Sequence, residues 1–505
     1  MTQEDGGLAK AGQSTDPDAL FQSALAARAV GDLAMAARLI DAVLTLMPGA
    51  RQALAARAQV ALQRAEPDAL GRFDAALRVD PGNPELHLGK ARALEHAGDR
   101  RGARIVTHQI AQQAPSYTEA VAFLSSLYLA TGEADFTAPF EAAAKRAPHD
   151  PNIPAAHCDA LAGLDMNARA AHVAADARKR FANEPHFALL EARNAGAAGD
   201  WKRAEAIFAD LSINTPDRWL SEARHRLRAL DLPAAQNLLD RALAADPADI
   251  AAWALQYLVW RLATDIASKA KARWLHEQAG LVQMRPLLAP DGLVPRVRPL
   301  LDKLHTHSGM PLGQSLRGGS QTRGLLLERP EPALAELHAA ITATLEAFRA
   351  DLPPADPSHP LLSQRDHRWK IAGSWSVRLQ SSQQQPGQQQ PSQQGATEHR
   401  EGGDYHTAHI HPSGIISSAL YLTVPEIISG NAKQGESGQG WLELGRPPVD
   451  LGLDLPPVRT IRPQEGYLAL FPSSLYHGTT AFGSGGADTP QQRLTVAFDV
   501  VPAAA

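Results

Sequence analysis

The sequence predicts a multidomain α + β protein, in which an N-terminal α-helical solenoid precedes a C-terminal all-β domain of the barrel or jelly-roll type. Three observations lead to this fold class. The N-terminal part, 1–265, is rich in Ala, Leu and Arg and poor in β-branched residues, which favours helices. Prolines recur in this part at nearly constant intervals. After Pro360, short segments rich in Ile, Val, Tyr, Phe and Trp alternate with Gly, Pro, Ser and Asn, as in all-β domains.

The composition is that of an ordinary globular protein, with 44% hydrophobic and 20% charged residues. A net charge of -5 gives no general attraction to nucleic acid or to an anionic membrane. A single cysteine, Cys158, excludes an intramolecular disulfide. The N-terminus lacks the basic region and apolar core of a signal peptide, and no apolar run approaches the roughly 18 residues of a membrane span. We therefore expect a cytoplasmic protein without nucleic-acid or membrane partners.

The prolines of the helical part mark a repeat. They stand at Pro48, Pro81, Pro115, Pro148, Pro185, Pro216 and Pro247, with spacings of 33, 34, 33, 37, 31 and 31. Three Gly-Asp pairs keep one constant spacing to a proline of this series, and an alanine follows each glycine by five: Gly31 with Ala36 and Pro48, Gly98 with Ala103 and Pro115, Gly199 with Ala204 and Pro216. Leu230, Asp231, Ala235 and Pro247 keep the same spacing, with leucine in place of glycine.

This pattern predicts stacked helical hairpins. Glycine permits the tight turn, the small alanine lets two helices approach, and proline ends the unit. The period near 34 resembles the tetratricopeptide repeat over residues 17–265. Such hairpins must stack to bury their apolar faces, and the solenoid that results usually offers a concave binding surface. The resemblance implies a peptide or protein partner for this part of the chain.

The remaining boundaries follow from local composition. We expect a disordered arm over residues 1–16, a helical linker or cap over 266–294 with one long helix at 266–284, and a C-terminal domain over 295–505. A further helix over 325–352 has Leu334, Leu337, Ile341 and Leu345 on one face. The strands are expected at 374–379, 409–410, 415–424, 440–444, 458–461, 467–471 and 494–501. A tract of Gln, Ser, Pro and Gly within 380–403 has almost nothing to bury and is predicted to be a disordered insertion.

Three histidines form the candidate metal site. His409 and His411 share one face of a strand, because side chains at i and i+2 point the same way. His477 comes much later in the chain, just after a strand that ends at Phe-Pro, which places it at a barrel mouth. Neutral imidazole suits Fe(II), Zn, Cu and Ni. His406 is separated from His409 by an odd number of positions, so we expect it on the opposite face, outside the ligand set or at the surface.

An arginine follows the last histidine of this set. Arg493 comes after His477, at the start of the last predicted strand, and Thr495 shares its strand face. A guanidinium binds a carboxylate through two parallel hydrogen bonds, and a hydroxyl on the same face can donate one more. This pair therefore predicts a receptor for a carboxylate. Trp375 and Arg378, on an earlier strand, are interpreted as packing and as a paired surface charge.

Residues 374–501 resemble the 2-oxoglutarate- and Fe(II)-dependent dioxygenases, in the prolyl-hydroxylase-like group and its bacterial branch with N-terminal tetratricopeptide repeats. The matching segments are 373–379, 409–425, 440–444, 463–478 and 493–502, and 314–322 also looks like this branch. The resemblance implies a double-stranded β-helix (jelly-roll) core, with Fe(II) as the metal and 2-oxoglutarate as co-substrate. It implies that His409 and His477 bind iron, that Arg493 and Thr495 hold the 2-oxoglutarate carboxylate, and that Tyr421 is a further candidate for the same pocket.

One position departs from the family pattern. The usual first motif is His-x-Asp or His-x-Glu, whereas this chain has His411 at the acidic position. Either His411 is a third metal ligand, or it lies aside and water fills the position. The aspartyl/asparaginyl hydroxylases also join such repeats to an oxygenase that lacks the carboxylate ligand, so the departure does not exclude activity.

The sequence thus predicts a dioxygenase that hydroxylates a peptide or protein recruited by the repeats. Two alternatives remain open. One is a cupin-like protein that binds a metal through three histidines without 2-oxoglutarate, although no acid stands between Pro412 and Ser418 where cupins often carry a glutamate. The other is a catalytically inactive scaffold.

Overall fold

The computed structural model describes residues 15–381, 403–429, 438–484 and 490–503. The predicted N-terminal arm and Gln-rich insertion lie almost wholly outside these residues. Helical hairpins occupy the first half: α2 (Pro17–Ala29), α3 (Leu33–Leu46), α4 (Arg51–Gln63), α5 (Ala69–Val79), α6 (Pro84–His96), α7 (Arg100–Gln113), α8 (Thr118–Ala130), α9 (Ala138–Arg146), α10 (Asn152–Ala162), α11 (Asn167–Arg180), α12 (His186–Ala197), α13 (Trp201–Asp210), α14 (Pro216–Arg228), α15 (Leu232–Ala245) and α16 (Ile250–Leu262). No helix among the described residues is long and apolar enough to cross a membrane.

The repeat pattern has the predicted structural meaning. Gly31, Gly98 and Gly199 stand at the turns inside hairpins with φ angles of 90°, 89° and 87°. These left-handed angles favour glycine because it has no Cβ. Leu230 occupies the same turn position with a φ of 56°. The predicted alanines have no exposed surface, in keeping with close helix approach: Ala36, Ala103, Ala204 and Ala235 are each 0% exposed.

The aspartate that follows each turn residue caps the next helix. Asp32 accepts a hydrogen bond from the backbone N–H of Met35 at 2.8 Å, and Asp99 accepts one from Gly102 at 2.8 Å. Asp231 does the same toward Ala234 at 3.2 Å. Such N-caps satisfy backbone donors that have no partner inside the helix. The repeated Gly-Asp pair therefore encodes a turn and a helix start together.

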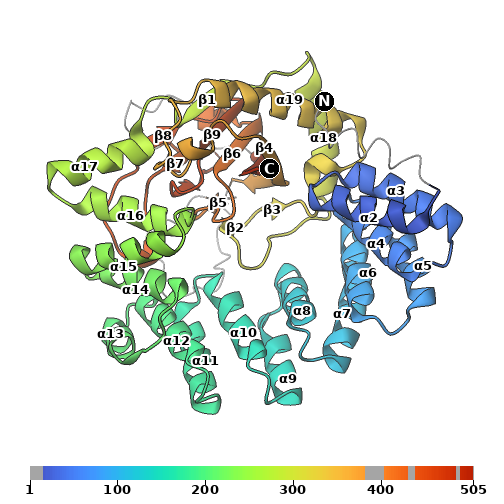
Figure 1. The fold of residues 1–505 in the computed structure, drawn as a ribbon, viewed down its shortest axis with the longest axis horizontal. Coiled ribbons are helices and arrows are strands. Elements are labelled where there is room, and N and C mark those ends of the chain that lie inside the picture. Colours follow the sequence, from blue (N-terminus) through green and yellow to red (C-terminus); the bar gives the residue numbers. More distant parts are fainter. Residues whose placement is uncertain (1–14, 382–402, 430–437, 485–489, 504–505) are drawn as a thin grey trace.

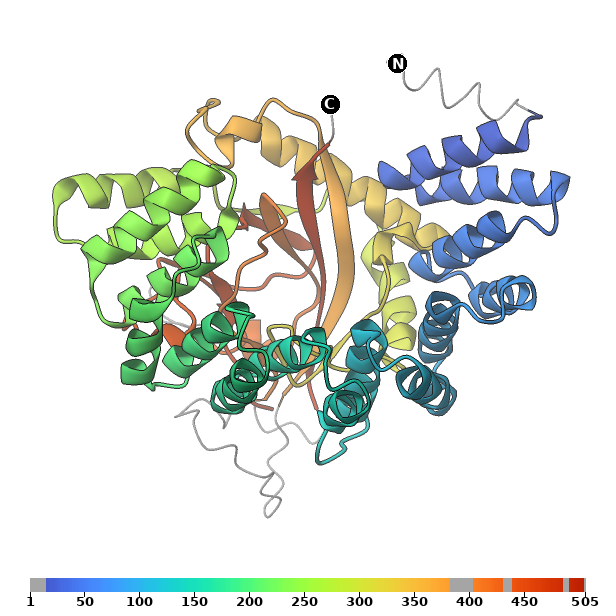
Figure 2. The same ribbon diagram turned by 60° about the horizontal axis from the view of Figure 1, so that its bottom comes forward.

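The solenoid curves around the C-terminal domain. Figures 1 and 2 show the helices as an arc from α2 to α16, with the strands inside it. Ion pairs join the two parts at widely separated points, between Arg323 and Glu95 at 3.2 Å and between Arg317 and Asp165 at 2.6 Å. The inner side of the arc thus holds the protein's own C-terminal domain.

The helix predicted over 266–284 is wrong in its second half. The chain forms α17 (Ile266–Ala272) and a π-helical turn at Arg273–Glu277, and then strand β1 (Gln283–Pro286). The helical conformation ends at Glu277, since Gln278 is already extended with φ -63° and ψ 139°. The strand forms because β1 pairs antiparallel with β9, so the predicted linker contributes to the β domain.

Two sheets build the C-terminal domain, as predicted for a jelly roll. Its other strands are β2 (Leu316–Arg317), β3 (Ser320–Gln321), β4 (Trp369–Gln380), β5 (Tyr405–His406), β6 (Ile416–Thr423), β7 (Leu442–Leu444), β8 (Arg459–Ile461), β9 (Tyr467–Pro472), β10 (His477–Thr479) and β11 (Gln492–Pro502). The larger sheet has the order β1-β9-β6-β11-β4-β3 and the smaller one β10-β7-β8, with antiparallel neighbours throughout. Strands β6 and β9 lie in the larger sheet while β7, β8 and β10 lie in the smaller one, so the chain crosses between the sheets as in a jelly roll. A short pair, β2 with β5, forms a separate two-stranded sheet, and His406 of β5 donates a backbone hydrogen bond to Oγ1 of Thr479 in β10.

The larger sheet has two different faces. Its outer face packs on α18 (Leu293–His305) and α19 (Pro332–Ala350), whose contacts include the predicted apolar stripe Leu334, Leu337, Ile341 and Leu345. Leu494, Val496 and Phe498 of β11 belong to this outer core. Because side chains alternate along a strand, Arg493, Thr495 and Asp499 lie on the other face, toward the barrel interior.

A candidate metal centre beside a buried arginine

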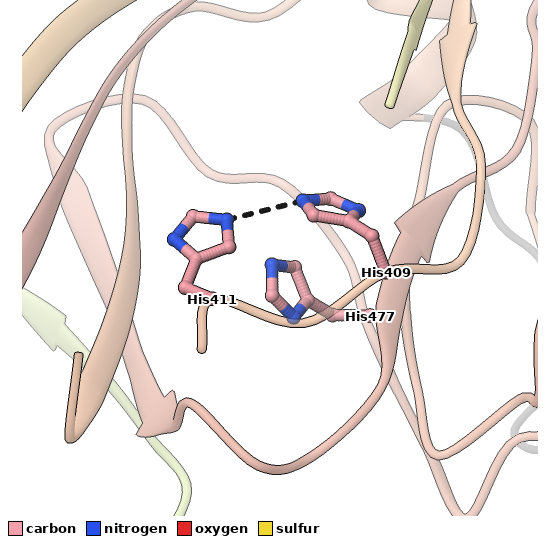
Figure 3. Close-up of side chains that lie close together, drawn as sticks. All are labelled: His409, His411 and His477. Carbon is pink, nitrogen blue, oxygen red and sulfur yellow. Dashed lines mark hydrogen bonds between the residues drawn. The ribbon is translucent and has the colours of Figure 1, made fainter. Parts of the chain in front are cut away.

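Three imidazoles meet at one end of the barrel. The ligand atoms of His409, His411 and His477 all lie within 4.8 Å of one another, and Figure 3 shows the three rings facing a common point. His477 begins β10. His409 is not in a regular strand, in contrast to the prediction, but forms one antiparallel bridge with His477. Two backbone hydrogen bonds of 2.9 Å, one in each direction, join these two residues.

Hydrogen bonds fix which nitrogen of each ring faces that point. Nδ1 of His409 is 2.8 Å from the carbonyl of Thr407, and Nδ1 of His477 is 3.1 Å from the carbonyl of Leu475. A carbonyl oxygen can only accept, so each Nδ1 carries the proton and each Nε2 lone pair is free for a metal. Burial, with the neighbouring His411, lowers the pKa of His409 to about 3. The neutral form that binds metals is therefore the one this site favours.

His411 has a carboxylate behind it. Its Nδ1 donates to Oδ1 of Asp499, while its Nε2 lies 3.1 Å from Nε2 of His409. A carboxylate that accepts from the far nitrogen of an imidazole orients the ring and makes it a stronger ligand. The structure thus places His411 among the converging rings rather than aside. Asp499 was not predicted, although it shares the alternating face of β11 with Arg493 and Thr495.

Two further side chains lie closer to the site than the sequence suggested. The ring of His406 stacks beside that of His409, with centroids 5.8 Å apart, and its Nδ1 is 3.1 Å from Oγ of Ser315. It is thus a neighbour of the imidazole cluster. Trp375 lies 5.7 Å from the ring of His411, so it borders the site in addition to packing in the domain.

Arg493 is a buried cation, with only 2% of its surface exposed. Its Nη1 donates to the carbonyl of Gly440, and its buried Nε has no hydrogen-bond partner among the described residues. Burial lowers the pKa of Arg493, since the environment disfavours its charge. A buried guanidinium without an acidic partner is costly unless an anion joins it.

The other predicted residues of this pocket lie next to Arg493. The guanidinium carbon is 5.9 Å from the ring centroid of Tyr421, and Tyr421 is paired in register with Thr495. Thr495 is 6% exposed and donates a long hydrogen bond, 3.4 Å, to the carbonyl of Val377. Phe471 connects the pocket to the histidines, because it packs in the cluster that contains Tyr421 and its ring centroid lies 4.8 Å from that of His477.

The chain thus joins a helical repeat domain to a jelly-roll domain with a candidate metal site. Residues 397–499 match the family described as "Putative 2OG-Fe(II) oxygenase", and residues 66–127 match the tetratricopeptide repeat. The chain therefore contains a "Putative 2OG-Fe(II) oxygenase" domain and an N-terminal tetratricopeptide repeat region, as its sequence predicts. No curated protein matches the chain.

Several solved structures are similar to the repeat part. A tetratricopeptide repeat protein from Parabacteroides merdae ATCC 43184 has 13% identity, with 51% of this chain and 97% of that chain covered and a TM-score of 0.30. PilF from Pseudomonas aeruginosa has 17% identity, coverage of 50% and 98%, and a TM-score of 0.26. MamA from Desulfovibrio magneticus RS-1 has 18% identity, coverage of 27% and 80%, and a TM-score of 0.26. At such TM-scores these likenesses support no functional conclusion.

Proposed function

We propose that this protein is a 2-oxoglutarate- and Fe(II)-dependent dioxygenase that hydroxylates a peptide or protein substrate. The observation that carries the proposal is the presence, in one barrel, of three converging imidazoles and a buried arginine with an unpartnered donor among the described residues. The imidazoles alone fit many metals, and the arginine alone fits many anions. Together they fit a metal whose co-substrate carries a distant carboxylate.

In this proposal the chain's residues have separate tasks. His409, His411 and His477 hold the metal through their Nε2 atoms, and Asp499 keeps His411 oriented. Arg493 receives a carboxylate of 2-oxoglutarate, since its Nε is a buried donor that needs an acceptor. When bound, Fe(II) and 2-oxoglutarate supply oxygen activation coupled to oxidative decarboxylation, which yields succinate, carbon dioxide and a hydroxylated substrate.

The aromatic floor of the pocket supports the same assignment. Tyr421 is 1% exposed, and its ring lies 5.9 Å from the guanidinium of Arg493. Together with Phe471, it makes this part of the barrel interior apolar around one charged group. In such surroundings water competes poorly for the guanidinium, so a carboxylate that replaces it gains more than it would at the surface.

A peptide or protein substrate fits the arrangement of the two parts. Tetratricopeptide repeats generally bind other proteins, and the side of the barrel that carries β2 and β5 faces the inside of the arc in Figure 1. Arg317 of β2 is paired at 2.6 Å with Asp165, at the turn between α10 and α11. The repeats thus contact the strand pair β2 and β5, which precedes His409 in the chain, and in our proposal they present a polypeptide there.

An anaerobic titration tests the proposal. Fe(II)-loaded protein is titrated with 2-oxoglutarate, and we expect a visible metal-to-ligand charge-transfer band. Arg493→Ala should abolish the band or raise the concentration needed for it at least tenfold, because the buried carboxylate partner is lost. Arg378→Ala is the matched control, since Arg378 is on the adjacent strand and bonds instead to the carbonyl of His305.

The other outcomes separate the alternatives. Tight zinc binding without any charge-transfer band would favour a cupin-like three-histidine metalloprotein that does not use 2-oxoglutarate. Absence of metal uptake would leave a repeat scaffold with an inactive barrel. A band that survives in Arg493→Ala would contradict the role given to this arginine.

A further inference from the structure

Helix α16 is mostly apolar around its whole circumference. In its sequence, IAAWALQYLVWRL, the only amide or charged side chains are those of Gln256 and Arg261, and a helix of this kind in a globular protein is buried on more than one side. One side, with Leu255, Leu258 and Val259, packs against α14 and α15. Another side, with Tyr257 and Trp260, packs in the cluster that contains Tyr421 and Phe471 of the barrel. The last helix of the solenoid is therefore inserted between the repeats and the metal-binding domain.

The cluster of α14, α15 and α16 also receives the neighbours of the metal-site histidines. Ile410, which lies between His409 and His411, packs against this cluster. Tyr476, which directly precedes His477, is a buried member of it. Both histidine-bearing segments thus have their adjacent side chains anchored in the repeat domain.

Two arginines of α14 bind one carboxylate of the C-terminal domain at the edge of the same cluster. Arg224 of α14 makes two hydrogen bonds to the carboxylate of Asp450, at 2.9 and 2.8 Å, and a longer one of 3.4 Å to the hydroxyl of Tyr476. Arg228 binds the same carboxylate at 2.8 Å and the Asp450 carbonyl at 2.8 Å. Burial favours a raised pKa for Asp450, but the charges of Arg224 and Arg228 outweigh it and hold that pKa below its usual value.

The backbone adds a third connection. Arg261 of α16 donates to the carbonyl of Gly445, and the Gly445 N–H donates to the carbonyl of Tyr476 at 2.7 Å. Leu444, the residue before Gly445, is paired in register with His477. A continuous path of contacts therefore leads from α16 to one of the proposed ligands.

We propose that α14 to α16 are a structural part of the metal centre, and that Arg224 is a positioning residue for its histidines. This inference rests on the proposed function. Within the barrel, His477 begins β10, which pairs with β7, whereas His409 belongs to no regular strand and is joined to His477 by one isolated bridge. The repeat domain adds support through its contacts with Ile410, Tyr476 and Asp450. Solenoid repeats then do more than recruit a partner, because they hold the metal ligands in place.

Metal affinity of the full-length protein tests the inference. Co(II) serves as an anaerobic probe whose visible spectrum reports ligand geometry. We expect Arg224→Met to weaken Co(II) binding about tenfold or more and to alter the spectrum, in line with the usual effect of removing groups that support metal ligands. Arg224→Lys, which keeps the charge near Asp450, should recover part of the affinity.

Arg193→Met is the matched control. Arg193 makes a similar ion pair, at 3.0 Å with Asp159, but between two repeat helices. Its replacement should leave Co(II) affinity and spectrum unchanged. If Arg224→Met does not fold, Asp450→Asn takes its place, because it removes the same charge pair with little change of shape.

The outcomes separate this inference from the function on which it rests. Wild-type affinity and spectrum in both Arg224→Met and Asp450→Asn would overturn the positioning role while leaving the oxygenase proposal intact. Equal losses in Arg224→Met and Arg193→Met would also overturn it, since the effect would then be general to the solenoid. A wild-type protein that binds neither Co(II) nor Fe(II) would overturn both proposals.

Discussion

At the scale of single residues, the candidate metal site differs from the His-x-Asp or His-x-Glu motif of the family that the sequence resembles, because its carboxylate lies behind a histidine. His411 stands where that motif has an acid, and Asp499 of β11 bonds to the far side of its ring. A negative charge is thus kept near the proposed metal, one imidazole further out. The carboxylate behind His411 can offset part of the positive charge of a bound metal, although less of it than a carboxylate that bound the metal directly.

The role of Asp499 can be measured. Asp499→Asn keeps the shape of the side chain but removes its charge, so we expect Co(II) or Fe(II) affinity to fall about 10- to 100-fold. Isothermal titration under anaerobic conditions gives the affinity directly. The same substitution in a His411→Ala background should have little further effect, because Asp499 acts through that ring.

A charge-matched control is available on α18. Asp302→Asn also removes one carboxylate charge. Asp302 accepts a hydrogen bond of 3.2 Å from Gln492, which begins β11, whereas Asp499 lies in the second half of that strand. The metal affinity of Asp302→Asn should equal that of the wild type. Equal weakening by both substitutions would mean that net charge, rather than the contact with His411, sets the affinity.

The sequence predicted the proposed metal ligands, but it did not predict the side chains that contact them. His409, His477 and Arg493 carry local signals, since motif spacing and strand alternation place them. Asp499 shares the alternation with Arg493, so its position in the barrel was predictable, whereas its contact with His411 depends on pairing between residues 88 apart. Trp375 was assigned to packing, because no local pattern shows that β4 passes beside His411.

At the scale of elements, the turn inside the hairpin of α14 and α15 holds an unfavourable residue. Leu230 has a φ of 56°, in the place that Gly31, Gly98 and Gly199 occupy elsewhere, and 61% of it is exposed. A left-handed conformation costs a residue with a Cβ roughly 1–2 kcal/mol. The exposed side chain gains little from packing that could offset this cost.

Leu230→Gly should therefore stabilise the repeat domain. We expect a gain of about 0.5–1 kcal/mol, because relief of the left-handed strain exceeds the added backbone entropy of the unfolded chain. Thermal unfolding followed by circular dichroism measures the shift of the midpoint. Ala229→Gly, one residue earlier at a right-handed φ of -81°, is the control and should lower the midpoint.

The elements differ in how far sequence predicts them. The hairpins and most of the predicted strands are set by local periodicity, and the structure confirms them with small shifts of their ends. Strand β1 escaped prediction because Gln283–Pro286 lacks an alternating pattern, and its partner in β9 is far along the chain. An edge strand of this kind is defined by the sheet that it joins rather than by its own residues.

At the scale of the whole molecule, the two domains share their cores. Tyr476 and Leu451 of the C-terminal domain are buried in the cluster of α14, α15 and α16. No sequence pattern predicted this docking, because Arg224 and Asp450 are 226 residues apart and each reads locally as an ordinary surface charge. We therefore expect that the C-terminal domain is not stable without the last helices of the solenoid.

A fragment spanning residues 279–505 tests this dependence. Without α16 it exposes the apolar surface around Tyr421, Phe471 and Tyr476. We expect it to bind a hydrophobic dye and to unfold without a cooperative transition, whereas the full chain unfolds cooperatively. A fragment that unfolds sharply and binds Co(II) as tightly as the full chain would contradict the prediction.

Because the solenoid surrounds a barrel that is encoded after it, the two parts can fold only in a fixed order during synthesis. Each repeat contacts mainly its neighbours, so the solenoid can fold as it leaves the ribosome. The barrel cannot, because β4 pairs with β11 near the end of the chain, with Trp369 opposite Pro502. The helices that receive the histidine segments are therefore synthesised before those segments, and we expect α16 to become fully buried only when the barrel forms.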